Sequence, residues 1–431
     1  MNFLCFREWR ETDILEEKNQ YTVRAVYEPL TATVCPNCQN GELIQKYGTK
    51  KRVVKDAPVR GKTVTVFLTI QLYRCAGCDR VFADEVPELP DRLQLTRRLI
   101  IYIIIHCLKK NYSEIGQETG ISESTVREIF TRFVEANQNL IPFEYPRVLG
   151  IDDVYIARTP RCILTDIEGR RVIEILPGRR IDIVYGFFDQ LKKGRENTQV
   201  VTMDMHRPFH SAVTDAFRYA KIVIDTFHVQ RNANMAISKF LGDVRESLNM
   251  SKRRLVLHDR FLLLKRYYNL TGEEKEKLKK WKAKWSELAE VYDLKEEFFM
   301  IWRLSNRKEA EDKYFNWKNG MSALSRRAFG EIITMIENWH DEIFNYFDYR
   351  YTNAFTESCN NLIKRMQSEG RGYDFETIRA KTLFGYCADS ISEENTSINS
   401  KVIRHVGSSR IERLRSVKES KIKHHFSGED E

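Results

Sequence analysis

The pattern of apolar and polar positions changes along the chain, and each change predicts a different kind of structure. Short apolar and β-branched runs such as residues 63–70, with Gly and Pro at the breaks, predict strands between about residues 35 and 90. Residues 92–135 then repeat at helical spacing, with one break near residues 120–122. Pro142 and Pro146 mark a linker after these helices.

Strand patterns return beyond the linker, at residues 148–156, 162–167 and 171–176, and again at 200–205 and 222–227. Helical segments are expected at about residues 181–192 and between the last two strands. An antiparallel hairpin followed by alternating strands and helices predicts a mixed α/β sheet. From about residue 233 to 345 large apolar residues recur at helical spacing among Lys and Glu, which predicts an all-α insertion, and a last helix begins near Asn353.

Composition narrows the class of protein. With 42% hydrophobic and 11% aromatic residues, disorder is excluded as the main state. The longest apolar run, residues 99–105, is far shorter than the roughly 20 residues that cross a membrane, so we expect no membrane partner. Arg7, Glu8 and Arg10 stand where a signal peptide has its apolar core, which predicts a cytoplasmic protein. The net charge of +9 is compatible with a nucleic acid partner.

Four of the nine cysteines form two CxxC pairs, Cys35 with Cys38 and Cys75 with Cys78, separated by strand-like sequence. Two such pairs can close a tetrahedral site for Zn²⁺, and their long separation favours a zinc ribbon with an extended hairpin over a compact finger. Free thiols or a redox CxxC are the alternatives. Residues 43–62 hold seven basic side chains against one acidic, and we expect this hairpin to contact DNA phosphates through Lys50, Lys51 and Arg52.

Residues 111–127 fit a helix-turn-helix with a turn at Gly120. Ser113 and Ser122 are expected to cap its two helices. The second helix would place Arg127 and its neighbours where a major groove is contacted. An ordinary helical hairpin is the alternative.

Three carboxylates occupy conspicuous positions in the predicted α/β region. Asp152 lies in its first strand, Asp204 ends a later strand, and Glu357 lies on the helix after the insertion. Carboxylates presented in this way can hold two Mg²⁺ or Mn²⁺ ions for phosphodiester chemistry, provided that they converge. A solvated strand end or a helix cap is the alternative for each.

A series of short motifs accompanies these residues, and with the two CxxC pairs it spans about residues 35–385: Gly150-Ile151-Asp152-Asp153, Asp204-Met205, Ile224-Asp225-Thr226-Phe227-His228-Val229, Asn353, Glu357, Asn360-Asn361, Ile363-Lys364 and Gly372-Tyr373-Asp374-Phe375. The chain thereby resembles the ISL-three family of bacterial insertion-sequence transposases. Their catalytic domain is an RNase H-like domain of the DDE type. The resemblance implies Asp152, Asp204 and Glu357 as the metal-binding triad. Because neighbouring strand residues face opposite ways, only one of Asp152 and Asp153 is expected to face the metals, and the resemblance favours Asp152.

Three further residues are candidates for contacts with DNA. On a helix, Asn361 and Lys364 lie four and seven residues after Glu357 and share its face. Lys364 would then contact a phosphate beside the metals, as the basic residue at that spacing does in related enzymes, unless it is simply solvated. Asp225 and His228 resemble the Asp-x-x-His element of several transposase superfamilies. His228 would hydrogen-bond a scissile phosphate or orient a carboxylate, and a structural histidine is the alternative.

The expected function is a bacterial DNA transposase that binds terminal inverted repeats, cleaves the element ends and transfers them to target DNA, as a homodimer or larger homo-oligomer. A DNA-binding transcriptional regulator with an inactive RNase H-like domain is the alternative, and a nuclease without strand transfer is a third. The expected fold is multidomain α/β. Its parts are an N-terminal extension (1–30), a β zinc ribbon (31–90), a helix-turn-helix domain (91–140), an RNase H-like mixed sheet (145–232 and 346–400) interrupted by an all-α insertion (233–345), and a basic polar tail (401–431).

Overall fold

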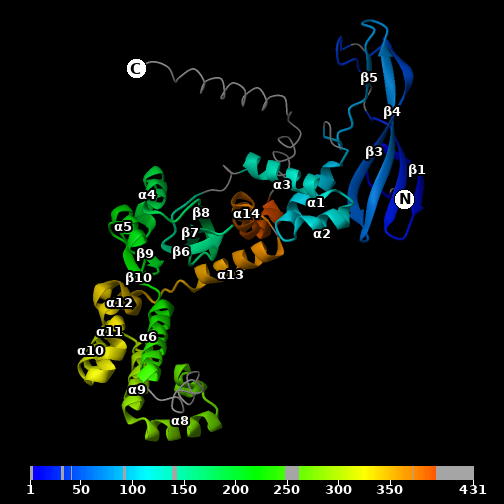
Figure 1. Cartoon of the computed structure of the whole chain (residues 1–431). Helices are drawn as coiled ribbons and strands as arrows, with labels where there is room; N and C mark the ends of the chain where they lie inside the picture. The colour runs from blue at the N-terminus through cyan, green and yellow to red at the C-terminus, as the bar shows by residue number, and fades with distance from the viewer. Residues whose placement is uncertain are drawn as a thin grey trace, which may run out of the picture. The chain divides into compact units, whose positions relative to one another are not determined.

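The computed structural model describes residues 3–30, 34–39, 41–90, 94–137, 143–247, 262–370 and 372–394 (Figure 1). The predicted tail at 401–431 lies outside these residues. The chain divides into two compact units: an N-terminal unit of residues 1–142 with 368–431, and a central unit of residues 143–367. Residues 368–394 therefore group with the N-terminal unit, although the sequence pattern assigned them to the α/β domain. None of the helices within the described ranges has the length and apolarity needed to cross a membrane.

The N-terminal unit is built on a five-stranded sheet of β1 (Trp9–Glu16), β2 (Gln20–Tyr27), β3 (Ile44–Val59), β4 (Lys62–Cys75) and β5 (Val81–Ala83). The strands lie in the order β1-β2-β4-β3, with β5 beside β4, and only the β2–β4 pairing is parallel. Alternate residues of β2 are buried in the core of this sheet. The expected N-terminal extension and the long β3–β4 hairpin therefore share one sheet and one core.

Three helices follow the sheet: α1 (Arg97–Cys107), α2 (Tyr112–Thr119) and α3 (Glu123–Asn137). The prediction of a single break in this region was wrong, because the chain also leaves the helix between α1 and α2. Asn111, not Ser113, caps α2, and its side chain accepts a hydrogen bond from the Glu114 N–H at 2.8 Å. Ser122 does accept one from the Thr125 N–H at 3.2 Å, as expected of a cap.

Helix α14 (Phe375–Glu394) packs on these three helices within the N-terminal unit. Lys381 is buried, and its ammonium group donates to the Lys110 carbonyl at 2.9 Å and to the Cys107 carbonyl, so it satisfies carbonyl groups at the end of α1. Phe384 lies with its ring 5.2 Å from that of Phe133 in α3. These contacts join α14 to the helical bundle.

The central unit holds the second sheet, of β6 (Val148–Ile156), β7 (Thr159–Asp166), β8 (Arg171–Leu176), β9 (Val200–Met203) and β10 (Lys221–Ile224). The strands lie in the order β10-β9-β6-β7-β8. The β6–β7 and β7–β8 pairs are antiparallel, whereas β9 is parallel to β6 and β10 is parallel to β9. The predicted mixed α/β sheet is confirmed by this arrangement.

Both faces of this sheet are covered. Apolar side chains of one face, including Ile151 and Val201, share a core with α4 (Ile181–Gln190) and α5 (Arg207–Ala216). On the other face Val148, Val200 and Val223 pack with tyrosines of α12 (His340–Tyr349) and of the segment before α13 (Ala354–Glu369). Helix α13 therefore runs along the face opposite α4 and α5.

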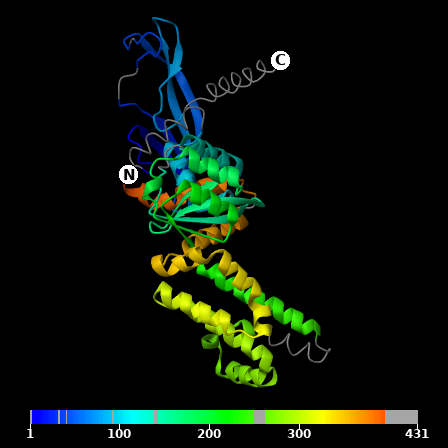
Figure 2. The ribbon, with the colours of Figure 1, turned by 90° about the vertical axis from the view of Figure 1, so that its left-hand side faces the viewer.

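The expected insertion is helical wherever the structure describes it. Its helices include α6 (Thr226–Ser247), α8 (Gly272–Lys284), α9 (Ser286–Ile301), α10 (Arg307–Asn319), α11 (Ala323–Asn338) and α12. Helix α6 runs from the sheet into the insertion, where α11 packs beside it (Figures 1 and 2). Apolar residues of α6 and of these helices belong to the same cluster as the core under α4 and α5. Four of the five insertion tryptophans, Trp281, Trp302, Trp317 and Trp339, are buried in it. The insertion and the sheet thus share one core.

Candidate active site and metal sites

Three aspartates meet at one edge of the central sheet because of its parallel strands. Asp204 directly follows β9, Asp225 directly follows β10, and Asp152 is the central residue of β6, one position beyond the last β6 residue that pairs with β9. Since β6, β9 and β10 are parallel, their carboxyl ends reach the same edge, which is where open α/β sheets bind their ligands. The strand order therefore brings together carboxylates that are far apart in the sequence.

Glu357 reaches this edge from the first turn of α13, and His228 reaches it from the first turn of α6. The His228 Nε2 lies 3.1 Å from an Asp204 oxygen and 3.1 Å from a Glu357 oxygen. Asp225 adds a third carboxylate, since oxygens of Asp225 and Glu357 and a His228 nitrogen lie within 4.8 Å of one another. One imidazole thus contacts carboxylates from two different elements.

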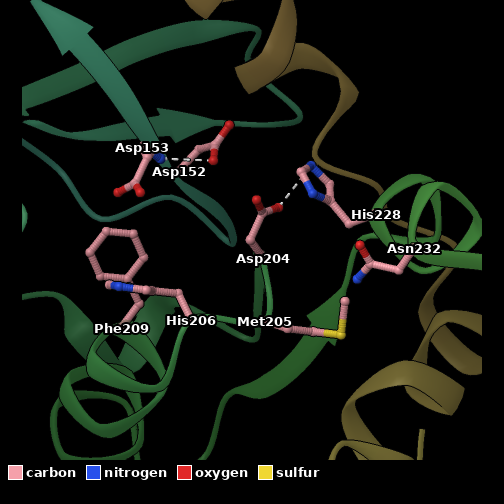
Figure 3. A pocket seen from close by; sticks show the side chains of 8 residues that line it. All are labelled: Asp152, Asp153, Asp204, Met205, His206, Phe209, His228 and Asn232. Carbon is pink, nitrogen blue, oxygen red and sulfur yellow. Dashed lines mark hydrogen bonds and ion pairs between the residues drawn. The ribbon is translucent and has the colours of Figure 1, made fainter. Parts of the chain in front are cut away.

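A cavity of about 240 Å³ opens at this edge. Figure 3 shows Asp204 near its centre, with His228 and Asn232 on one side and His206 and Phe209 on the other. The full lining also includes Asp152, Asp153 and Met205. The cavity is therefore bordered by acidic groups and by two histidines.

Asp152 and Asp153 both line this cavity, although only one of these neighbours was expected to face it. Their carboxylates have different partners. Asp152 accepts a hydrogen bond of 2.8 Å from the amide group of Asn360, whereas Asp153 forms an ion pair with Arg179. Asp153 therefore already has a cationic partner, whereas the Asp152 carboxylate is held by a neutral amide.

The electrostatics of the site favour a cation. Burial, reinforced by the neighbouring carboxylates, raises the pKa of Asp152 to about 7 and that of Asp204 to about 8. Burial also raises the pKa of Asp225. One oxygen of Asp204 is buried and has no hydrogen bond to any of the described residues. The same oxygen lies in ionic contact with His228. Such clustered carboxylate oxygens suit a hard divalent cation such as Mg²⁺ or Mn²⁺.

Helix α13 lies close to β6 because of small residues at the contact. The hydroxyl groups of Thr165 and Thr356 are 2.7 Å apart, directly over Gly150. A Cβ atom at Gly150 would lie 2.3 Å from the Thr165 hydroxyl and 2.6 Å from that of Thr356. Only glycine leaves room for this approach, which brings Glu357 to the sheet edge.

The four cysteines of the CxxC pairs converge in the N-terminal unit. The sulfur of Cys35 lies 3.5 Å from that of Cys78, and Cys38 and Cys75 are related in the same way at 3.5 Å. All four sulfurs lie within 4.8 Å of one another, close to the spacing of about 3.8 Å implied by tetrahedral Zn–S bonds of about 2.3 Å. A hydrogen bond from the Cys38 backbone is the main cause that lowers the pKa of Cys35 to about 6, which favours the metal-binding thiolate. The cluster fits Zn²⁺.

The other predicted contact residues have varied surroundings. Lys50 and Lys51 are exposed on β3, and Arg52 beside them is half-buried. Arg127 on α3 lies 3.5 Å from Glu123 and packs 5.2 Å from the ring centre of Tyr112. Asn361 and Lys364 are exposed on α13, whereas Asn360, which the sequence analysis assigned no role, is buried against Asp152.

Comparisons with known proteins give a family match and a match to a relative. Residues 149–382 match the family model DDE_Tnp_ISL3, described as a transposase, and this segment contains Asp152, Asp204 and Glu357. The chain is also 22% identical over 357 residues to the transposase for insertion sequence element IS1001 of Bordetella parapertussis. That alignment covers 81% of this chain and 88% of the relative. Since the family match spans more than half of the sequence, the chain belongs to the ISL-three family of DDE transposases.

Proposed function

We propose that this transposase binds the terminal inverted repeats of its insertion sequence, cleaves DNA at the element ends and joins the freed ends to target DNA. The observation that carries the proposal is the convergence of Asp152, Asp204 and Glu357, from a strand, a strand end and a helix, at one acidic sheet edge. We assign the central sheet to the RNase H-like fold. Its order, an antiparallel three-stranded meander extended by two parallel strands, supports this assignment.

Asp152, Asp204 and Glu357 would hold two Mg²⁺ or Mn²⁺ ions. When bound, such ions activate a water or 3′-hydroxyl nucleophile and stabilise the leaving oxygen of an in-line displacement. The protein supplies the fixed positions of the oxygen ligands. His228, which lies 3.1 Å from both Asp204 and Glu357, would orient these two carboxylates from the side. This arrangement favours the carboxylate-orienting role of His228 over a direct phosphate contact.

The exposed face of α13 would guide DNA to the metals. Asn361 and Lys364 follow Glu357 on this helix and are both exposed, so their side chains are free to reach a phosphate group. Hydrolysis and strand transfer share the same in-line geometry, so a single metal site can serve both reactions.

The N-terminal unit would recognise the terminal repeats. We propose that Cys35, Cys38, Cys75 and Cys78 bind one Zn²⁺ and so hold the ends of β3 and β4, making β1–β5 a zinc ribbon domain. Lys50, Lys51 and Arg52 on β3 would contact phosphates, and α2 and α3 would form the helix-turn-helix that carries Arg127. Phosphate contacts then set the position of the protein and base contacts set its register.

Two element ends must be brought together, so we propose a homodimer or a larger homo-oligomer as the active form. With DNA as its substrate, the protein would act at the nucleoid in the cytoplasm of its bacterial host. The sequence match to a transposase of a bacterial insertion sequence supports this setting.

The test is cleavage of labelled DNA that carries the terminal repeat of the element, with Mg²⁺, by wild type and by Asp204→Ala. We expect the wild type to cut at the element end and Asp204→Ala to bind the DNA without cutting it. Asp215→Ala is the matched control, since it removes an exposed carboxylate from α5 and should cut like the wild type. Equal binding by all three proteins with no cutting under any divalent metal would instead support a DNA-binding regulator.

A further inference from the structure

Glu357 stands between two buried asparagines, Asn353 just before α13 and Asn360 one turn after Glu357. We propose that these two side chains act as an amide clamp that fixes Asp152 and Glu357 relative to each other, making both asparagines positioning residues of the metal site. The inference rests on the proposed metal-dependent function and extends it to residues that do not themselves bind metal.

Asn360 holds the Asp152 end of the site. Its side-chain nitrogen donates to an Asp152 carboxylate oxygen at 2.8 Å and to the Asp153 backbone carbonyl at 3.0 Å, and the residue is only 6% exposed. Both partners are acceptors, so only the NH₂ group of the amide can face them. Asn360 therefore fixes the carboxylate of Asp152 in one orientation.

Asn353 holds the start of α13. Its side-chain nitrogen donates to the Ile151 carbonyl at 3.1 Å, and its side-chain oxygen accepts from the Thr202 hydroxyl at 3.1 Å. Its backbone N–H donates to an Asp225 oxygen at 3.3 Å. Asn353 is fully buried, and these three bonds connect the helix to β6, β9 and the residue after β10.

The register of the sheet explains why amides are needed here. The pairing of β6 with β9 ends at Ile151 and Met203, because the chain leaves the sheet at Asp204. Beyond that point β6 continues without β9, and the two amides bond the carbonyls of Ile151 and Asp153, on either side of Asp152. The two amides thus supply hydrogen-bond donors to carbonyl groups of β6 at the point where β9 has ended.

The clamp has a direct consequence for metal affinity. Asn353 and Asn360 lie seven residues apart, with Glu357 between them, so α13 is held at two points around its own ligand. Partners that orient metal ligands typically contribute about 10–100-fold to metal affinity. Loss of either amide should therefore weaken metal binding even though each ligand residue remains present.

The experiment is an Mn²⁺ titration of the full chain with zinc retained, followed by the electron paramagnetic resonance signal of free Mn²⁺. Asp204→Asn removes the carboxylate of one proposed ligand and so tests whether Mn²⁺ binds at the proposed site. We expect Asn360→Ala and Asn353→Ala to weaken binding about 10-fold or more. Asn360→Leu keeps the volume of the side chain and should weaken binding similarly if Asn360→Ala does not fold.

Thr198→Val is the matched control, because it also removes a buried side-chain hydrogen bond of the central unit, to the Pro146 carbonyl at 2.8 Å, but at the opposite ends of β6 and β9 from the carboxylates. It should lower thermal stability yet leave Mn²⁺ affinity within about twofold of wild type. If Asn360→Leu binds Mn²⁺ as wild type does, or if Thr198→Val weakens binding equally, the clamp is refuted while the metal site stands. If wild type and Asp204→Asn bind Mn²⁺ alike, the proposed function fails, and the clamp fails with it.

Discussion

Asp204 is largely buried beside Asp152, Asp225 and Glu357, and its raised pKa of about 8 records the free-energy cost of ionising it there. In an unfolded chain an aspartate ionises near pH 3.9. Because the folded pKa is the higher one, the contribution of Asp204 to stability is complete below about pH 4 and is lost as the pH rises to about 8. Metal binding needs an ionised Asp204, and ionising Asp204 lowers the stability of the metal-free protein.

We accordingly expect Asp204→Asn to be more stable than wild type at pH 8 in Mg²⁺-free buffer and equal to it at pH 4. A gain of about 1 kcal/mol would raise the unfolding temperature of a domain of this size by roughly 2–4 °C. Chelators are to be avoided because they would also remove Zn²⁺ from the site proposed at the cysteine cluster. Saturating Mn²⁺ should stabilise only the wild type. If Asp204→Asn is no more stable than wild type at pH 8, the proposed repulsion among these carboxylates is wrong.

Some residues of this site could be predicted from the sequence, and others could not. The sequence pattern and the family resemblance pointed to Asp152, Asp204 and Glu357, and the structure brings the elements that carry them to one edge. Asn360 was missed, because Asn360 and Asn361 are chemically identical and only the rotation of α13 decides which one faces Asp152. The Arg179–Asp153 ion pair was missed because its partners come from separate segments.

At the scale of elements, the β3–β4 hairpin presents its basic residues on an exposed strand. Lys50 and Lys51 lie opposite Ile70 and Thr69 in the register, several residues from the cysteine cluster. Each lysine that contacts a phosphate releases about 0.9 counterions when DNA binds. The salt dependence of binding therefore reports how many of these lysines touch DNA.

Replacing both lysines, Lys50→Ala with Lys51→Ala, should weaken binding of repeat and unrelated DNA alike. It should also reduce the slope of log K against log salt by about 2. Binding would be measured by fluorescence anisotropy across a series of salt concentrations. Lys18→Ala, in the turn between β1 and β2, removes an exposed positive charge from the same sheet and serves as the control. An unchanged slope in the double variant would exclude this face of the hairpin from the interface.

Elements were predictable to the extent that local chemistry marks them. No strand was predicted within residues 1–30, although the alternation of Tyr21, Val23, Ala25 and Tyr27 is typical of one. The parallel partner of this strand, β4, lies too far along the chain for the pattern to reveal the pairing. The break between α1 and α2 has neither Gly nor Pro at residues 108–111, and its only local signal is the cap residue Asn111. Tertiary packing therefore determines both the pairing of β2 with β4 and the break between α1 and α2.

At the scale of the whole molecule, the hydrophobic clusters differ in extent. The sheet of β1–β5 has its own cluster, whereas one cluster runs from the central sheet through α6 into the helical insertion. The insertion is therefore part of the structure that supports the proposed metal site. Its tryptophans contribute mainly to this core: Trp317 is 2% exposed, donates to the Leu294 carbonyl at 2.8 Å and packs 4.9 Å from the ring of Phe298.

These separate cores predict that the chain unfolds in more than one calorimetric step, with each step assignable by a single substitution. Trp317→Ala should cost about 3–5 kcal/mol and lower only the transition of the central unit, because it opens a cavity in the core shared by sheet and insertion. Cys38→Ser should lower only the transition of the N-terminal unit, because a site with three thiolates holds Zn²⁺ less tightly. Cys5→Ser, an exposed cysteine of the same unit outside the cluster, is the control for Cys38 and should change neither transition. Trp317→Ala could instead split the central transition into two steps and leave the temperature of the step that Mn²⁺ raises unchanged. The insertion would then be an independent domain and would not support the proposed metal site.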